Sequence, residues 1–241
     1  MRNIPKEQIL RSLQHQNPWW ERPHEVPAVY TDCRPRSYLP HFTALIGESG
    51  VHRAVVLMGP RRVGKTFLVH HAIQDLLEQG TDPNSIAYFA LDQPLFNGLG
   101  LEEIVGYYLE LVGEQHRGQP AYVFFDEIQY LRNWEAHLKS MVDLYPELRI
   151  AVSGSAAAAL RLGSRESGAG RFTDLMLPPL TFQEYLMLLS LESLVQPERE
   201  DEERTWRATD PNALNEHFQR YLNFGGYPEV LFSKEIQQAP E

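Results

Sequence analysis

The chain has 241 residues, of which 43% are hydrophobic, and a formal net charge of −10. This length can bury a substantial core, and the acidic balance argues against a broad nucleic-acid-binding face, which would need clustered basic side chains. No stretch approaches the roughly 18 apolar residues of a membrane span, the first residues lack the apolar run of a signal peptide, and Cys33 is the only cysteine. We therefore expect a cytoplasmic protein with no disulfide within the chain, no multi-cysteine zinc site and no membrane contact.

Residues 1–45 are expected to form a leader that packs on the core. The leader contains the run Asn17-Pro18-Trp19-Trp20, followed by a proline-rich stretch through Pro35 and Pro40. Tandem tryptophans can stack on an adenine base or dock a partner, and they can equally anchor the leader by burying a large apolar area. Of these alternatives we favour anchoring.

A phosphate-binding pattern begins where the core begins. Residues 53–58 are a short apolar run with β-branched side chains, which is typical of a strand buried on both faces of a parallel sheet. The octapeptide Gly59-Pro60-Arg61-Arg62-Val63-Gly64-Lys65-Thr66 follows and fits the P-loop pattern G-x-x-x-x-G-K-[ST] at every fixed position. Residues 66–80 then place apolar side chains on one helical face, with Gly80 as the expected C-cap. These flanks favour a phosphate loop over a surface turn that holds two glycines and a lysine by chance.

Each fixed residue of this pattern has a chemical reason. Gly59 and Gly64 let the backbone curl so that its N–H groups cradle phosphate oxygens. Lys65 is placed to reach the β- and γ-phosphates, and the Thr66 hydroxyl is placed to ligate Mg²⁺. The following helix presents its positive N-terminal end to the same phosphates. The predicted nucleotide-binding residues are Gly59, Pro60, Arg61, Arg62, Val63, Gly64, Lys65, Thr66 and Phe67.

Two adjacent carboxylates end a second apolar run, residues 119–127. Because ligands of open α/β sheets lie beyond the carboxyl ends of the strands, Asp126 is expected to emerge beside the phosphate loop. There it would help to hold Mg²⁺, and Glu127 would polarise an attacking water. The alternative is a strand that ends in a solvated acidic turn. The presence of a phosphate loop in the same chain favours the functional interpretation.

Strands and helices alternate through the core. Further strands are expected at 85–92, 148–155 and 171–177, and helices at 101–115, 134–145 and 181–194. This alternation predicts an α/β fold with helices on both faces of a parallel sheet. The extra strand at 85–92, between the strand before the phosphate loop and the strand that ends in Asp126, suggests the AAA-type and RecA-like arrangement. In that arrangement another strand is inserted beside the strand that leads into the phosphate loop.

The order of five elements resembles a family of predicted bacterial and archaeal AAA-type P-loop ATPases. They are Gly59-Pro60-Arg61-Arg62-Val63-Gly64-Lys65-Thr66, Phe124-Phe125-Asp126-Glu127-Ile128-Gln129, Ser153-Gly154-Ser155, Gly170-Arg171-Phe172 and Phe224-Gly225-Gly226-Tyr227-Pro228. The Asn17-Pro18-Trp19-Trp20 run looks like the leader of the same family. The resemblance covers about residues 10–232. It implies an AAA-like (ASCE) core with ATP and Mg²⁺ as ligands, followed by a small helical lid.

The resemblance also implies roles for four further residues. Ser155, or less favourably Ser153, would sense the γ-phosphate through its hydroxyl, although a small residue that merely closes a strand is an equal alternative. Arg171 would supply charge to a nucleotide, within its own chain or from a neighbouring subunit. A solvated arginine at a strand start is slightly favoured over that role. Asp92 would orient Mg²⁺-bound water, and a plain strand-ending aspartate is the equal alternative.

The predicted division of the chain has four parts: the leader at 1–45, the ATPase core at 46–195, an acidic surface linker at 196–205 and the start of the helical lid at 206–241. Family members usually continue into a further C-terminal domain, often nuclease-like. This chain is therefore expected to be part of a longer protein or a short member of the family.

The expected function is Mg²⁺-dependent ATP binding and hydrolysis, with in-line attack of water on the γ-phosphate; adenine rather than guanine rests on the resemblance. Lys65, Glu127, Arg171 and Ser155 are the expected catalytic residues, and Thr66 and Asp126 the expected metal ligands. One alternative is a nucleotide-gated interaction module with negligible turnover; another is an ATPase accessory of a nucleic-acid-processing system. Homo-oligomerisation or an unidentified protein partner is compatible with each. Arg161, Arg165 and Arg171 could form a local basic groove, but a solvated loop is favoured.

Overall fold

The computed structural model describes residues 5–48, 50, 52–116, 118–155, 170–197 and 206–233. Arg161, Arg165 and most of the predicted acidic linker, residues 198–205, lie outside the described residues. In the part of the chain that is described, no helix is long and apolar enough to cross a bilayer.

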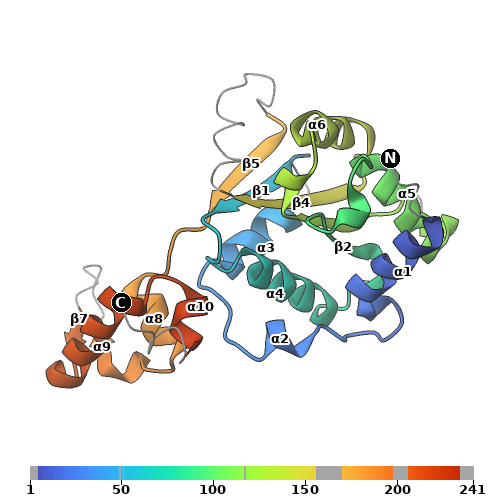
Figure 1. Ribbon diagram of the computed structural model, residues 1–241. Helices are drawn as coiled ribbons and strands as arrows, with labels where there is room; N and C mark the ends of the chain where they lie inside the picture. The colour runs from blue at the N-terminus through green and yellow to red at the C-terminus, as the bar shows by residue number, and fades with distance from the viewer. Residues whose placement is uncertain are drawn as a thin grey trace.

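Five parallel strands form the central sheet, in the order β2-β3-β4-β1-β5 (Figure 1). The strands are β1 (Ala54–Gly59), β2 (Ile86–Ala90), β3 (Ala121–Asp126), β4 (Leu148–Ser155) and β5 (Phe172–Met176). Strand β4 lies between β1 and β3, which confirms the inserted strand that the sequence suggested. The pairing sets Gly59 opposite Ser155, so the phosphate loop begins beside the end of β4.

Helices cover both faces of the sheet, as the alternation predicted (Figure 1). One core cluster joins one face of the sheet to α1 (Lys6–Gln16), α5 (Leu101–Val112) and α6 (Trp134–Leu144). The other cluster joins the opposite face to α3 (Leu39–Gly47) and α4 (Lys65–Glu78). All six residues of β1 are buried because alternate side chains enter the two clusters.

The leader covers one of the two edges of the sheet, the edge formed by β2. Strand β2 is an edge strand, and its unpaired backbone groups face side chains of the leader instead of another strand. The Asn17 side chain accepts from the Tyr88 N–H at 2.6 Å and donates to the Tyr88 carbonyl at 2.9 Å. The indole N–H groups of Trp19 and Trp20 both donate to the Ile86 carbonyl, at 2.9 and 2.8 Å. This arrangement supports anchoring as the role of the tandem tryptophans, and it covers an edge that would otherwise be open to pairing with another chain.

A separate group of helices follows β5 and lies at one side of the core in Figure 1. It contains α8 (Phe182–Leu188), α9 (Pro211–Phe224), α10 (Pro228–Phe232) and a hairpin of β6 (Val195–Pro197) with β7 (Trp206–Ala208). Residues of α8, α9 and α10 share one hydrophobic cluster. We call this group the lid. Helix α8 packs with the lid although the sequence assigned it to the core; the predicted domain boundaries stay predictions.

Within the described ranges, the remaining short elements are one further α-helix and several 3₁₀ helices. They are α2 (Ala28–Thr31), η1 (Pro18–Trp20), η2 (Pro83–Ser85), η3 (Pro94–Phe96), η4 (Glu114–His116), η5 (Ile128–Tyr130) and η7 (Glu192–Leu194). The predicted helix at 181–194 ends early, at Leu188. Ser190 takes a left-handed conformation, with φ of 58°, and the Leu191 N–H bonds the Leu186 carbonyl at 2.8 Å, which is the geometry of a Schellman C-cap.

Candidate functional site

The phosphate loop connects β1 to α4 and depends on its two glycines for different reasons. At Gly59 a Cβ atom would lie 2.4 Å from the Leu177 carbonyl oxygen, so a side chain there would collide with backbone. Gly64 has a φ of +97°, a conformation in which most side chains are strained. The first glycine therefore permits a close approach, and the second permits the turn into the helix.

Lys65 is buried at the start of α4, with 4% of its surface exposed. Its ammonium group donates to the carbonyls of Gly59 and Pro60, at 3.1 and 3.0 Å. Burial lowers the pKa of Lys65, and the nearby charges of Glu127 and Asp126 oppose that shift. The side chain thus lies along the inner side of the loop, next to the acidic end of β3.

Asp126 is the most highly bonded side chain of the site. Its Oδ2 accepts from the Thr66 hydroxyl at 2.7 Å and from the Tyr88 hydroxyl at 2.9 Å. Its Oδ1 accepts from the Ser153 hydroxyl and from the Glu127 N–H. A carboxylate that accepts four hydrogen bonds is held in one orientation, so the Thr66 and Asp126 oxygens stay side by side.

Glu127 follows in a strained conformation. Its φ of 57° and ψ of 46° lie in the left-handed region, which is uncommon for residues other than glycine. The side-chain Nε2 of Gln129 donates to the Glu127 carboxylate, while the side-chain Oε1 of Gln129 accepts from the Ser155 N–H at 3.1 Å. Gln129 therefore links the second carboxylate of the pair to the end of β4.

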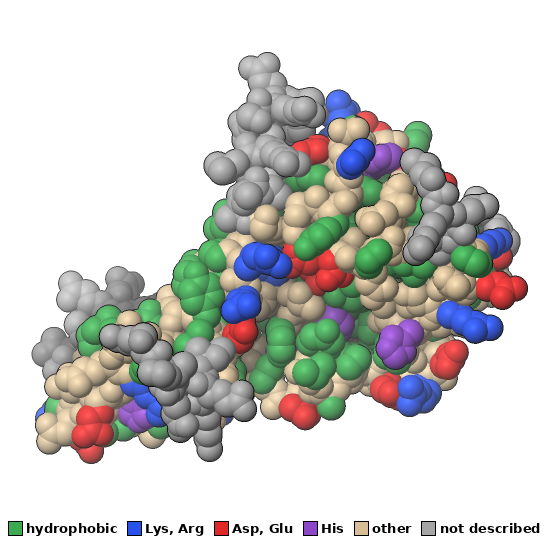
Figure 2. Space-filling model, in the orientation of Figure 1, with side chains coloured by type: hydrophobic (Ala, Val, Ile, Leu, Met, Phe, Trp, Pro, Cys, Tyr) green, Lys and Arg blue, Asp and Glu red, His purple; other side chains and the backbone are tan. Residues whose placement is uncertain are grey.

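Gly64, Lys65, Thr66 and Glu127 line a cavity of about 510 Å³. Its polar lining includes Lys65 and Thr66 at the start of α4 and Glu127 directly after β3, together with polar side chains of the leader and the lid, Arg34, Arg36 and Glu229. Apolar side chains from the leader and the lid, among them Val29 and Leu188, line another part. The cavity has the size and the mixed lining of a small-molecule site, in the usual range of about 300–1,000 Å³. Figure 2 shows basic and acidic side chains as neighbours where the lid meets the core.

The lid reaches the phosphate loop through its Gly-Gly-Tyr-Pro element. The Pro228 ring lies 3.6 Å from the position that a Cβ on Gly64 would take. Glu229 forms an ion pair with Arg62 of the loop at 3.1 Å, and both side chains are largely solvated. The sequence placed this element in the lid but gave no indication that it lies against the phosphate loop.

Three rings, those of Tyr30, His70 and Tyr88, pack against one another next to Asp126. The Tyr30 ring stacks on His70 with centroids 3.7 Å apart, and His70 contacts Tyr88 with centroids 4.5 Å apart. Burial lowers the pKa of His70 to about 4, although its backbone hydrogen bond to Thr66 and the charge of Asp126 oppose the shift. His70 is therefore neutral at pH 7 and packs as an aromatic ring.

The residues expected at the site fall into two groups. Lys65, Thr66, Asp126 and Glu127 come together, and Ser155 ends β4 opposite Gly59. Ser153, the less favoured serine, is the one that contacts Asp126. Asp92 follows β2 near the carboxyl ends of the strands, and its negative charge helps to raise the pKa of Tyr88 and of Tyr30.

Arg171 lies elsewhere. It precedes β5, and its carbonyl accepts from the N–H of Ala54, the first residue of β1, so it sits at the amino end of strands whose carboxyl ends carry the site. Its side chain pairs with Asp143 at 2.7 Å. Five residues of β5 separate this position from the carboxyl ends of the strands, so it does not bring Arg171 to the site of its own chain, and a role there stays untested. A role in a neighbouring subunit stays a prediction.

Sequence reasoning missed the leader and lid residues that line the cavity, and it missed Tyr88 and Gln129, which contact the two carboxylates. Tyr88 belongs to a neighbouring strand, and only the pairing register of β2 with β3 brings its hydroxyl to Asp126. Gln129 belongs to the predicted Phe124–Gln129 motif, but the sequence prediction gives it no role of its own. Its position two residues after Glu127, in a tight turn, was the available signal.

The oxygens of Thr66 and Asp126 suit a magnesium ion. They are hard donors, held 2.7 Å apart at the edge of the cavity. Among the described residues, no three His, Cys, Asp or Glu side chains gather into a cluster that could hold a metal ion. This pattern fits Mg²⁺, which usually takes one or two protein ligands and completes its shell with water and substrate phosphates.

The fold and the site together define a P-loop NTPase. Over residues 51–186, more than half of its length, the chain matches the AAA domain family. The chain belongs to this family, and its function is therefore of the P-loop ATPase kind.

Two curated proteins that resemble this chain are themselves described as uncharacterized. The uncharacterized protein MJ1637 of Methanocaldococcus jannaschii is 27% identical over 198 residues, which cover 79% of this chain and 41% of that protein. An uncharacterized protein of Haemophilus influenzae is 22% identical over 182 residues, which cover 75% of this chain and 40% of that protein. The chain thus spans about two fifths of the length of the curated relatives it matches.

Solved structures share the fold at low sequence identity. The S. cerevisiae Hsp104-ADP complex matches with a TM-score of 0.53 and 14% identity, over 85% of this chain and 31% of that one. The Aeropyrum pernix ORC1 protein in complex with DNA matches with a TM-score of 0.51 and 13% identity, over 88% of this chain and 60% of that one. At these identities the likeness shows the architecture alone.

Proposed function

We propose that this chain binds ATP together with Mg²⁺ and hydrolyses it by in-line attack of water on the γ-phosphate. The observation that carries the proposal is the contact between the Thr66 hydroxyl and the Asp126 carboxylate at 2.7 Å, at the edge of a cavity that Lys65 and Glu127 also line. An alcohol oxygen, a carboxylate, an ammonium group and a second carboxylate form a set that can bind Mg²⁺ and phosphates and orient a water for phosphoryl transfer.

Each side chain has one task in this proposal. The loop N–H groups and the N-terminus of α4 bind the phosphate oxygens. The Lys65 ammonium leaves the carbonyls of Gly59 and Pro60 and pairs with the β- and γ-phosphate oxygens, which compete for it as full negative charges. Thr66 and Asp126 would hold Mg²⁺, which when bound supplies positive charge to the same oxygens.

Glu127 is assigned to the attacking water. Its carboxylate accepts a hydrogen bond from the water and orients it in line with the bond that breaks, between the γ-phosphorus and the bridging oxygen of ADP. The water oxygen forms the new bond to phosphorus, and its proton passes to the carboxylate or to a phosphate oxygen. The strained backbone of Glu127 is consistent with a carboxylate whose direction is imposed by the end of the strand.

Hydrolysis and its alternative differ in turnover. The alternative is a nucleotide-gated interaction module, and the observation that favours it is the contribution of the lid to the cavity, through Leu188, Pro228 and Phe232. Nucleotide in the cavity would bias the pose of α10, and a partner would bind one pose. The two functions are compatible in one molecule, but only the first requires measurable phosphate release.

Phosphate release from Mg·ATP, measured with ATP binding, tests the proposal. We expect wild type to bind and turn over, and Glu127→Gln to bind with turnover reduced by a factor of about 10² or more, because general-base assistance contributes about 10²–10⁴. Lys65→Ala should bind ATP poorly, and Glu7→Gln, in the first turn of α1, serves as the control for loss of an exposed carboxylate.

The other outcomes are also informative. Tight binding by wild type with turnover no faster than that of Glu127→Gln contradicts hydrolysis by this chain alone and favours the interaction module. Absence of ATP binding contradicts both functions. A rise in activity per subunit with protein concentration would support the predicted role of Arg171 in a neighbouring subunit, and a flat profile would count against it.

A further inference from the structure

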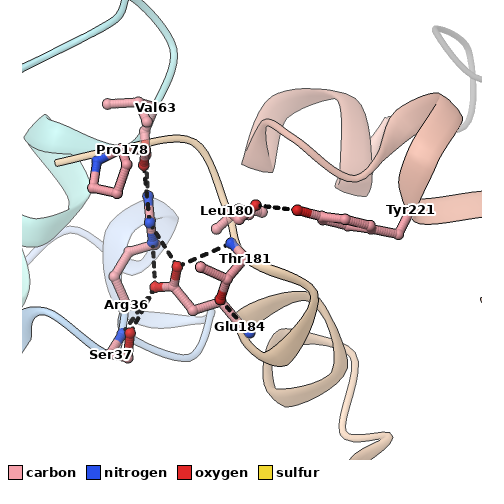
Figure 3. Close-up of polar contacts among 8 residues, drawn as sticks. All are labelled: Arg36, Ser37, Val63, Pro178, Leu180, Thr181, Glu184 and Tyr221. Carbon is pink, nitrogen blue, oxygen red and sulfur yellow. Dashed lines mark hydrogen bonds and ion pairs between the residues drawn. The ribbon is translucent and has the colours of Figure 1, made fainter. Parts of the chain in front are cut away.

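Arg36 joins three parts of the molecule that are far apart in sequence (Figure 3). It lies in the leader, between α2 and α3, and only 4% of its surface is exposed. Its Nε and Nη2 atoms donate to the two carboxylate oxygens of Glu184 in α8, at 2.7 and 2.8 Å. Its Nη1 donates to the Val63 carbonyl of the phosphate loop at 2.8 Å, and Nη2 also donates to the Pro178 carbonyl at 3.1 Å.

The Glu184 carboxylate is equally well bonded. Besides Arg36, it accepts from the N–H and the hydroxyl of Ser37 and from the Thr181 N–H, which closes a capping box at the start of α8. Burial alone would raise the pKa of Glu184, but the hydrogen bonds and charge of Arg36 outweigh burial and hold the pKa below its usual value. The pair is therefore ionised at neutral pH and fixed by a satisfied network rather than by charge alone.

The bond to Val63 bears on phosphate binding through the geometry of the peptide group. The Val63 carbonyl and the Gly64 N–H belong to one planar trans peptide and point in opposite directions. A guanidinium that holds the carbonyl on its own side therefore directs the Gly64 N–H away from Arg36. Gly64 lines the cavity, as Arg36 does, and a backbone N–H at this point of the loop is the kind of donor from which a phosphate cradle is made.

We propose that Arg36 is a positioning residue for the phosphate loop: it fixes the Val63–Gly64 peptide in its phosphate-binding orientation and, through Glu184, ties the first lid helix to the same peptide. This inference rests on the proposed function, because it concerns how that site binds phosphate. The loop is then preorganised by the leader before any nucleotide arrives, and α8 cannot move relative to the leader and the loop without breaking the network.

Two variants test the proposal without leaving a buried charge unpaired. Arg36→Met combined with Glu184→Leu removes both charges, and replacing a buried ion pair with apolar side chains of similar volume commonly keeps or raises stability. Arg36→Lys keeps one positive charge but cannot form the forked pair and the carbonyl bond together. Arg149→Lys is the matched control, since Arg149 also donates to two backbone carbonyls, those of Gly47 and Glu48, at the opposite end of the sheet.

The readout is the dissociation constant of ADP compared with that of adenosine, by calorimetry, with thermal melting of each variant. A positioning role predicts ADP binding weakened about tenfold or more, the scale of losing a hydrogen bond to a charged group. Arg36 also lines the cavity, so adenosine binding should weaken too, but by a factor several times smaller than ADP binding, because adenosine has no phosphate for the loop to bind. Arg36→Lys should weaken ADP binding by less than the double variant does, and Arg149→Lys should leave both constants unchanged.

Several outcomes would overturn the inference. Equal weakening of ADP and adenosine would show that Arg36 acts only by holding the fold, and unchanged ADP binding in a folded double variant would show that the loop does not need it. Should the double variant fail to fold, Arg36→Lys decides by the same comparison. Wild type that binds neither ligand removes the proposed function itself, which separates that failure from a failure of the role of Arg36.

Discussion

At the scale of single residues, Asp126 shows how neighbouring strands build the site. The carboxylate comes from β3, but Tyr88 of β2 and Ser153 of β4 donate to it from either side. Phosphate-loop residues could be predicted because one local pattern contains them. Tyr88 could not, because its contribution depends on the register of two strands that are more than thirty residues apart.

Tyr88→Phe tests the contribution of that hydroxyl. Hydrogen bonds to charged groups contribute about 1.5–3 kcal/mol, so we expect the free energy of unfolding to fall by about that amount in urea titrations. With Asp126 held less firmly, the Mg²⁺ concentration that gives half-maximal ATPase rate should rise.

Tyr108→Phe is the control for Tyr88→Phe, because the Tyr108 hydroxyl donates to the Asn84 carbonyl and does not touch the site. It should lower stability without changing the Mg²⁺ dependence. An equal shift in Mg²⁺ dependence for the two variants would show that the Tyr88 bond serves stability alone.

Gly59→Ala tests the close approach of the phosphate loop to the chain after β5. A Cβ at Gly59 would meet the Leu177 carbonyl oxygen at 2.4 Å, and a backbone atom cannot rotate away. We expect the free energy of unfolding to fall by about 1–3 kcal/mol, as in other overpacked sites, with a matching loss of ATP binding. Gly106→Ala, in the exposed middle of α5 with nothing within 4 Å of its new Cβ, should instead stabilise by about 0.5–1 kcal/mol. Similar thermal shifts for the two alanines would contradict this account.

At the scale of elements, the end of α4 could be predicted from the sequence, but the end of α8 could not. Gly80 follows α4 with a φ of +84° and closes a Schellman cap, as its identity predicted. Ser190 closes the same kind of cap after α8, and a serine carries no comparable signal. The helix therefore ends six residues before its predicted end, and the chain turns back so that Leu191 and Leu194 join the lid cluster.

The first lid helix should also respond to pH through Glu184. Because the folded-state pKa lies below the ordinary value, the pair stabilises the fold fully above the unfolded pKa of about 4.3 and loses that contribution as pH falls through the folded pKa. Between pH 6 and pH 3, wild type should lose stability more steeply than the variant with Arg36→Met and Glu184→Leu. The difference in slope is at most about 1.4 kcal/mol per pH unit, for one proton. Parallel urea-unfolding profiles for the two proteins would show that Glu184 is not held below its usual pKa.

At the scale of the whole molecule, the parallel sheet, its two helical layers and a strand inserted beside the phosphate-loop strand could be predicted, because apolar runs alternate with helical stretches. The positions of the two edge strands were not predicted. The position of the lid was not predicted either. It depends on long-range contacts, such as Arg36 with Glu184 and Pro228 with the phosphate loop, which no local pattern encodes. The cavity is therefore an assembly of leader, core and lid, of which only the core part could be predicted.

This assembly predicts where Mg·ADP should protect backbone amides from hydrogen exchange. The cavity lies between α2, the phosphate loop and α10, and these elements should gain protection together because ligand contacts tie them to one another. Helix α5 belongs to the core cluster on the opposite face of the sheet and should exchange as it does without ligand.

Lys65→Ala provides the control for this exchange experiment, since it should bind Mg·ADP poorly and show little added protection in α2 or α10. Protection confined to the phosphate loop would mean that the lid does not close on nucleotide, and the cavity would then be a site of the core alone. Uniform protection of α5 and α10 would indicate global stabilisation by mass action, without a specific contribution of the lid.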